Sequence, residues 1–134
     1  MKSVTSQLDD WVQITEYLAK APESIFKNFR TLPIFRIVIE GISIEGGAHL
    51  LLRLKRNHFF IDALHLIRTS ENFEPSCILK LHVNGKNVNI SPTTARYCNN
   101  TINLINLFGL NVLSRNIVEI GGGYGGECKI IHDF

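Results

Sequence analysis

Residues 116–129 read NIVEIGGGYGGECK, and this stretch carries the strongest fold signal in the chain. Its first part, 116–120, is a short apolar run of the kind that forms a buried parallel strand. A glycine-rich turn over 121–126 follows, and Glu127 begins a predicted helix that reaches Phe134. Strand, glycine-rich turn and helix in this order open an α/β sheet that binds a nucleotide or another cofactor. We therefore predict the α/β class, with this segment as its first Rossmann-like β-loop-α unit.

The glycines in this turn have separate predicted tasks. Gly121 lets the chain turn sharply away from the strand, and Gly123 removes the Cβ atom that would keep a ligand from the backbone. Gly125 or Gly126 lets the following helix pack closely on the strand. The N-terminus of that helix presents free N–H groups to a negative ligand group. The alternative is a tight strand-to-helix turn that binds nothing.

The spacing of the glycines fits two classes of cofactor. Gly121, Gly123 and Gly126 match the dinucleotide pattern GxGxxG, whereas Gly121, Gly123 and Gly125 match the GxGxG pattern of S-adenosylmethionine sites. Glu119 favours the second class, because a carboxylate ~6 Å from a phosphate costs roughly 3 kcal/mol at an effective dielectric of ~20. S-adenosylmethionine instead brings an ammonium and a sulfonium group. A flavin or nicotinamide oxidoreductase remains the alternative within the enzyme class.

Two segments of the chain resemble a known family. The segment IVEIGGGYGG, residues 117–126, resembles motif I of the sugar O-methyltransferases, which are class I S-adenosylmethionine-dependent enzymes. The segment SPTTARY, residues 91–97, resembles a second signature of that family at a similar distance before the glycines. Ala95 departs from the family, which often has leucine there. The resemblance is specific over 91–131 and vague before it.

The resemblance implies a methyl transfer to a sugar hydroxyl, with a carbohydrate or glycoconjugate as acceptor. It implies that Arg96 and Tyr97 order the entrance to the site, although Tyr97 fits equally well as a core aromatic residue. It also implies that the cofactor is bound by these residues: Glu119, Gly121, Gly122, Gly123, Tyr124 and Gly125. Of these, Glu119 and the glycines at 121, 123 and 125 would contact its methionine part.

Some of the binding and catalytic residues that such an enzyme needs are not found in the sequence. An acidic residue that binds the ribose hydroxyls belongs ~20 residues beyond the glycine turn, but only eight residues follow Gly126. No catalytic base can be assigned either. We therefore expect the sequence to be the N-terminal part of a longer enzyme, with 116–134 as the start of the cofactor-binding domain, and to be inactive alone.

Residues 1–77 are predicted to form a helical subdomain. Ser43 and Asn57 are placed to cap two of its helices, and Gly41 is placed to end another in a left-handed conformation. Phe26 and Phe29 are expected to face inward. The predicted helices cover 6–19, 22–30, 33–41, 44–56 and 58–70.

A β-hairpin is predicted over 78–90, because Asn84-Gly85 is the preferred pair for a type I′ turn. With that turn, Leu81 faces Val88, and both strands place their apolar residues on one face. The same register sets Leu79 opposite Ile90 and His82 opposite Asn87.

A helix and a link are predicted to connect this hairpin to the glycine segment, over 91–115. Ser91 is its predicted N-cap, and Gly109 its end. The expected inward positions are Ala95, Tyr97, Cys98, Ile102, Leu104, Ile105 and Phe108.

The amino-acid composition and the charge distribution exclude several classes of protein. The 134 residues are 45% hydrophobic and 19% charged, which fits a single folded domain and excludes general disorder. Positive and negative charges are interspersed at a net charge of +2, so no nucleic-acid surface is predicted. No apolar run is long enough for a membrane span.

The polar start and the three widely spaced cysteines predict a cytoplasmic protein with free thiols. The five histidines show no metal-ligand spacing. A non-catalytic helical interaction module with a vestigial glycine loop is the hypothesis outside the enzyme class.

Overall fold

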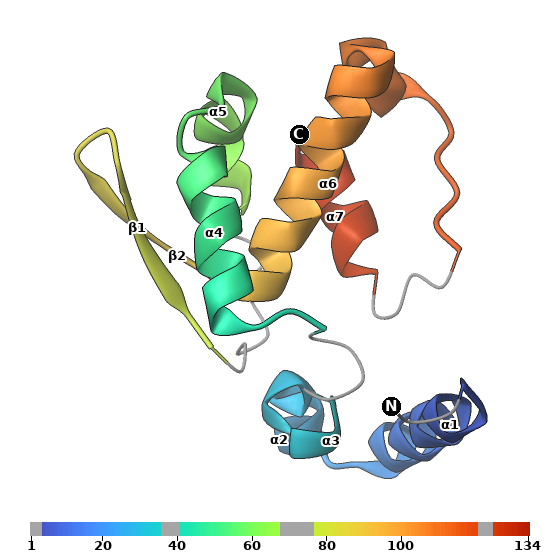
Figure 1. Ribbon diagram of the computed structural model, residues 1–134. Coiled ribbons are helices and arrows are strands. Elements are labelled where there is room, and N and C mark those ends of the chain that lie inside the picture. The colour runs from blue at the N-terminus through green and yellow to red at the C-terminus, as the bar shows by residue number, and fades with distance from the viewer. Residues whose placement is uncertain (1–3, 36–40, 68–76, 121–124) are drawn as a thin grey trace. The chain divides into compact units, whose positions relative to one another are not determined.

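The computed structural model describes residues 4–35, 41–67, 77–120 and 125–134 (Figure 1). It is mainly helical, with one two-stranded antiparallel sheet among these residues. The chain divides into two compact units. The N-terminal unit comprises residues 1–41 with 73–76, and the main unit comprises 42–72 with 77–134.

Among its described residues, the N-terminal unit has one helix of 17 residues and three short helices, which bury a few aromatic and aliphatic side chains. The rings of Phe29 and Phe35 pack edge to face with their centroids 4.5 Å apart, and Ile14 is also buried. Phe26 is 46% exposed, so the prediction that it faces inward is wrong. The reason is that the predicted helix 22–30 ends early and a separate turn carries Phe29. The elements are α1 (Val4–Lys20), α2 (Glu23–Lys27), the 3-10 helix η1 (Phe29–Thr31) and α3 (Pro33–Phe35).

The main unit contains four α-helices, one 3-10 helix and the hairpin among its described residues. Three of its helices begin at side-chain caps, as predicted for each. The Ser43 hydroxyl accepts from the Gly46 N–H at 3.1 Å, Asn57 from the Phe60 N–H at 3.2 Å, and Ser91 from the Thr94 N–H at 3.1 Å. The elements are α4 (Ile44–Leu54), α5 (His58–Ile67), β1 (Leu79–Val83), β2 (Lys86–Ile90), α6 (Pro92–Phe108), η4 (Leu110–Ser114) and α7 (Gly126–Asp133).

The hairpin has the predicted register. Leu81 pairs with Val88, Leu79 with Ile90, and His82 with Asn87. Asn84 and Gly85 both have positive φ, 49° and 75°, as a type I′ turn requires. The apolar face is buried and the opposite face is exposed.

Helix α6 is the centre of the main unit (Figure 1). It packs against α4 and α7, and the hairpin continues the same core past α4. Gly47 is buried in α4 where that helix passes Pro92, so the two helices approach closely at this point. The buried apolar residues that α6 contributes to the core include Ala95, Tyr97, Cys98, Ile102 and Ile105.

Two predictions about the second half of the chain are wrong. Residues 116–119 form no strand and 120 lies in a turn, and the side chains of Val118 and Ile120 are 86% and 97% exposed. The physical reason is that the hairpin is the one sheet among the described residues, and neither of its strands pairs with this segment. Phe108 is also exposed rather than inward, because it lies in the last turn of α6, beyond the residues that face the core.

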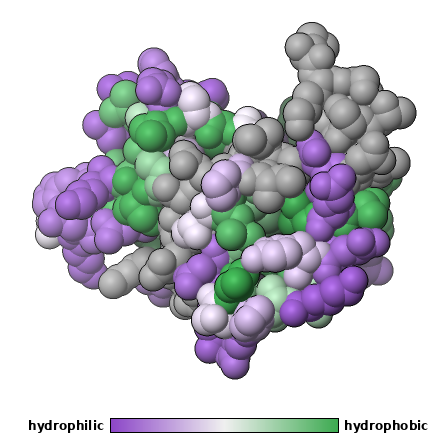
Figure 2. Space-filling model, turned by 90° about the horizontal axis from the view of Figure 1, so that it is seen from below, coloured by the Kyte–Doolittle hydropathy of each residue, from purple (hydrophilic) through white to green (hydrophobic). Residues whose placement is uncertain are grey.

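Apolar side chains are therefore part of the surface as well as the core. Hydrophobic residues lie between hydrophilic ones in the view of Figure 2. Leu107 and Leu110, near the end of α6, are more than half exposed. Within the described ranges, every helix is too short or too polar to cross a lipid bilayer.

Candidate cofactor-binding site

The candidate site lies where the chain enters α7. Gly125 precedes the helix with a left-handed φ of 79°, and a Cβ atom there would meet nothing within 4 Å. Ile130, which is 1% exposed, fixes α7 in the core next to α6. Gly121, Gly122, Gly123 and Tyr124 lie outside the described residues. Of the six predicted cofactor-binding residues, the structure thus describes Glu119 and Gly125.

Glu119 lies beside the first turn of α7. Its carboxylate Oε2 accepts a hydrogen bond from the Cys128 thiol, with 2.9 Å between the sulfur and the oxygen. This hydrogen bond is the main reason that the pKa of the exposed Cys128 thiol is raised, because it holds the neutral thiol as a donor. The half-buried Glu119 carboxylate is thereby held against the first turn of α7.

Glu127, in the first turn of α7, places a second carboxylate near that of Glu119. Asn100 of α6 donates from its amide to Glu127 Oε2 at 3.3 Å. Burial raises the pKa of Glu127, and the neighbouring Glu119 raises it further, whereas the Asn100 hydrogen bond and Arg96 oppose the shift. The first turn of α7 is therefore a place of concentrated negative charge, next to backbone N–H groups that carry the positive end of the helix dipole.

The raised pKa of Glu127 predicts the pH dependence of stability. A carboxyl group whose pKa is higher in the folded state favours folding when it is protonated, and this contribution is lost as the pH rises through the folded-state pKa. We expect Glu127→Gln to match the wild type at about pH 4 and to be more stable by about 0.5 kcal/mol near pH 7, since solvent screens a half-exposed charge. Denaturant unfolding of both proteins over this pH range measures the difference. A variant less stable than the wild type near neutral pH would mean that Asn100 and Arg96 outweigh burial.

The start of α7 differs from the starts of α4 and α6, each of which is capped by a serine side chain. Ser43 and Ser91 satisfy N–H groups of α4 and α6, but the residue before α7 is Gly125, which has no side chain to cap the helix. The first N–H groups of a helix have no partner within the helix. The start of α7 therefore presents hydrogen-bond donors beside the carboxylates of Glu119 and Glu127.

Arg96 and Tyr97, the residues expected to order the entrance to the site, both lie on α6, and Arg96 interacts electrostatically with Glu127. Tyr97 is buried in the core, which is the alternative role considered for it. Arg96 is half-exposed, with its guanidinium carbon 5.2 Å from the centre of the Tyr97 ring. The sequence reasoning missed Asn100 and Cys128, because nothing in the local pattern shows that either side chain meets a glutamate.

No three His, Cys, Asp or Glu side chains come together as metal ligands in the part of the chain that the structure describes. Comparison with protein-family models, with curated proteins and with solved structures gave no match to this chain.

Proposed function

We propose that this chain carries the cofactor loop of an S-adenosylmethionine-dependent methyltransferase that acts on a sugar hydroxyl. The observation that supports it best is the 2.9 Å hydrogen bond from Cys128 to Glu119, which holds a carboxylate next to the start of α7. The sugar as acceptor rests on the resemblance of 91–97 and 117–126 to the sugar O-methyltransferases.

The charges at this place fit the two ends of the methionine part of that cofactor. The Glu119 carboxylate would hold the cationic groups, and the backbone N–H groups at the start of α7 would hold the cofactor's carboxylate. When bound, the cofactor supplies a methyl group on a positively charged sulfur. The contribution of the described residues is to bind and orient it. A dinucleotide fits less well, because it would bring two negative phosphates to the carboxylates of Glu119 and Glu127, whereas S-adenosylmethionine brings one carboxylate and two cationic groups.

The proposal is tested by the opposite effects of one substitution on two ligands. In Glu119→Gln, the affinity for S-adenosylmethionine should fall about tenfold, because a charge-assisted contact is lost. The affinity for NADH should rise or stay undetectable, because the same change removes a repulsion. Isothermal titration calorimetry on the 134-residue chain measures both, and needs no turnover.

Glu16→Gln is the matched control, since Glu16 is exposed on α1 and lies in the N-terminal unit. It should leave both affinities unchanged. Tight binding of NADH or FAD without S-adenosylmethionine would instead favour an oxidoreductase. Cooperative unfolding with no binding of any of the three would favour the helical interaction module.

A further inference from the structure

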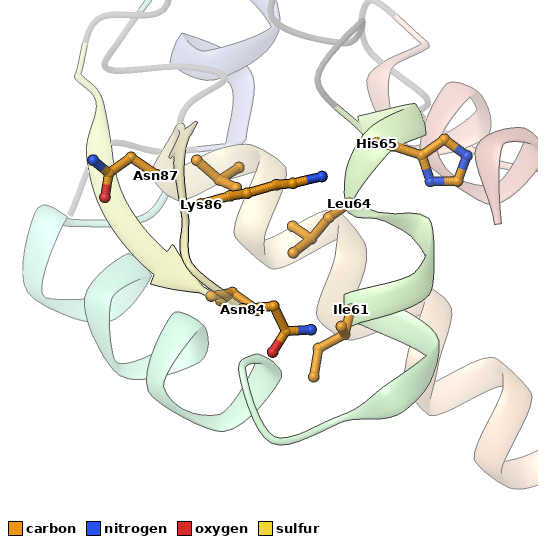
Figure 3. A pocket seen from close by; sticks show the side chains of 8 residues that line it. Ile61, Leu64, His65, Asn84, Lys86 and Asn87 are labelled. Atoms are coloured by element: carbon orange, nitrogen blue, oxygen red, sulfur yellow. The ribbon is translucent and has the colours of Figure 1, made fainter.

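A groove lies between α5 and the hairpin, away from the glycine segment in sequence (Figure 3). Its volume is about 410 Å³, which lies in the range of small-molecule sites. Its apolar floor consists of Ile61 and Leu64 of α5 and Val83 and Val88 of the hairpin. Three of these four side chains, all except Ile61, are less than 9% exposed, so the floor is part of the packed core.

Lys86 breaks the apolar pattern of the hairpin on this side. It pairs with Val83 and is two residues before Val88, so it lies on the same face of the sheet as these buried valines. In Figure 3 its ammonium points across the groove toward α5, and the side chain of Asn84 points toward Ile61. A charged group and an amide therefore lie at the edge of an apolar floor.

The described residues that line the groove give it a positive charge. None of the eight side chains that line it is acidic. Lys86 makes no ion pair with any residue that the structure describes. The ring of His65, at the edge of the groove, donates from Nδ1 to the Asp62 carbonyl oxygen of its own helix at 2.8 Å. Lys86 is thus the charged side chain available to a ligand.

We propose that this groove binds a small amphipathic organic anion, with an apolar chain on the floor and a carboxylate or phosphate at Lys86. Apolar walls alone would accept any hydrophobic molecule, and a surface lysine alone would accept any anion. The combination selects a ligand that carries both features. The inference does not depend on the proposed methyltransferase function, since it uses none of the residues near α7.

Octanoate and octanol are matched probes, because they differ in charge at equal chain length. We expect octanoate to shift the amide NMR signals of α5 and the hairpin in the full chain, with an affinity about fivefold higher than that of octanol. Lys86→Met should remove this preference and leave octanol binding unchanged, and Lys86→Arg should keep it. Octyl phosphate distinguishes a phosphate-bearing ligand from a carboxylate.

Lys80→Met is the control, because Lys80 is exposed on the opposite face of the hairpin. It should leave the preference intact. Equal binding of octanoate and octanol, or an equal loss in Lys80→Met, would overturn the proposal. So would equal shifts with inorganic phosphate, which would indicate a simple anion site. Shifts of the same signals with protein concentration alone would show that a second copy of the chain fills the groove.

Discussion

Replacing Gly47 with alanine should lower the free energy of unfolding by about 2 kcal/mol. A Cβ atom at this position would lie 2.6 Å from Cβ and 2.7 Å from Cα of Pro92, and 3.1 Å from a methyl carbon of Leu79. Pro92 is the first residue of α6 and cannot rotate out of the way, so α4 and α6 must move apart. This strain lowers the free energy of unfolding by about 3 kcal/mol, and the higher helix propensity of alanine raises it by about 1 kcal/mol. Denaturant unfolding measures the sum.

Gly46→Ala is the matched control, one residue earlier in the same helix. Its Cβ atom would meet Cγ1 of Ile42 at 3.0 Å, which is part of a flexible side chain rather than backbone. The gain in helix propensity should then offset the contact, and the stability should change by less than about 0.5 kcal/mol. Equal losses in both variants would mean that helix α4, rather than its contact with Pro92, responds to alanine.

Replacing Ile130 with alanine should lower the free energy of unfolding by about 3 kcal/mol, because the side chain is 1% exposed and its loss leaves a cavity. Ile130 joins α7 to the core that α5 and α6 share. Because α7 has only eight residues, it depends on this packing rather than on its own helical propensity. Thermal or denaturant unfolding measures the loss, and the alkylation rate of Cys128 should rise as α7 loosens from its place beside Glu119.

His132→Ala is the control on the same helix. The side chain of His132 is 89% exposed, so its removal should change the stability by less than about 0.5 kcal/mol. If Ile130→Ala unfolded at the wild-type midpoint with unchanged Cys128 reactivity, α7 would not be packed as described.

The hairpin and the capped helices could be predicted from the sequence because their signals are local. Asn84-Gly85 sets the turn, and the turn fixes the register, which then sorts every apolar residue to one face. Ser43, Asn57 and Ser91 each satisfy an N–H group within three residues of themselves. Such contacts depend little on the rest of the chain.

The features that could not be predicted depend on distant residues. An apolar run such as 116–120 has the composition of a strand, but a strand also needs a neighbour to pair with, and its own residues do not reveal one. Helical periodicity likewise placed Phe26 and Phe108 inward without knowing where the core ends. The contacts of Glu119 with Cys128 and of Glu127 with Asn100 join residues 9 and 27 positions apart, so no local pattern predicts them.

The short junction between β2 and α6 limits how the hairpin can move relative to the helix. The strand ends at Ile90 and the helix begins at Pro92, so the buried Ser91 is the whole connection, and its hydroxyl also bonds to Thr94 at 2.9 Å. The proline ring fixes φ at the first helical residue, so this joint has fewer free dihedral angles than a link without proline. We therefore expect the hairpin to keep its orientation relative to α6, whose residue Asn100 donates a hydrogen bond to Glu127.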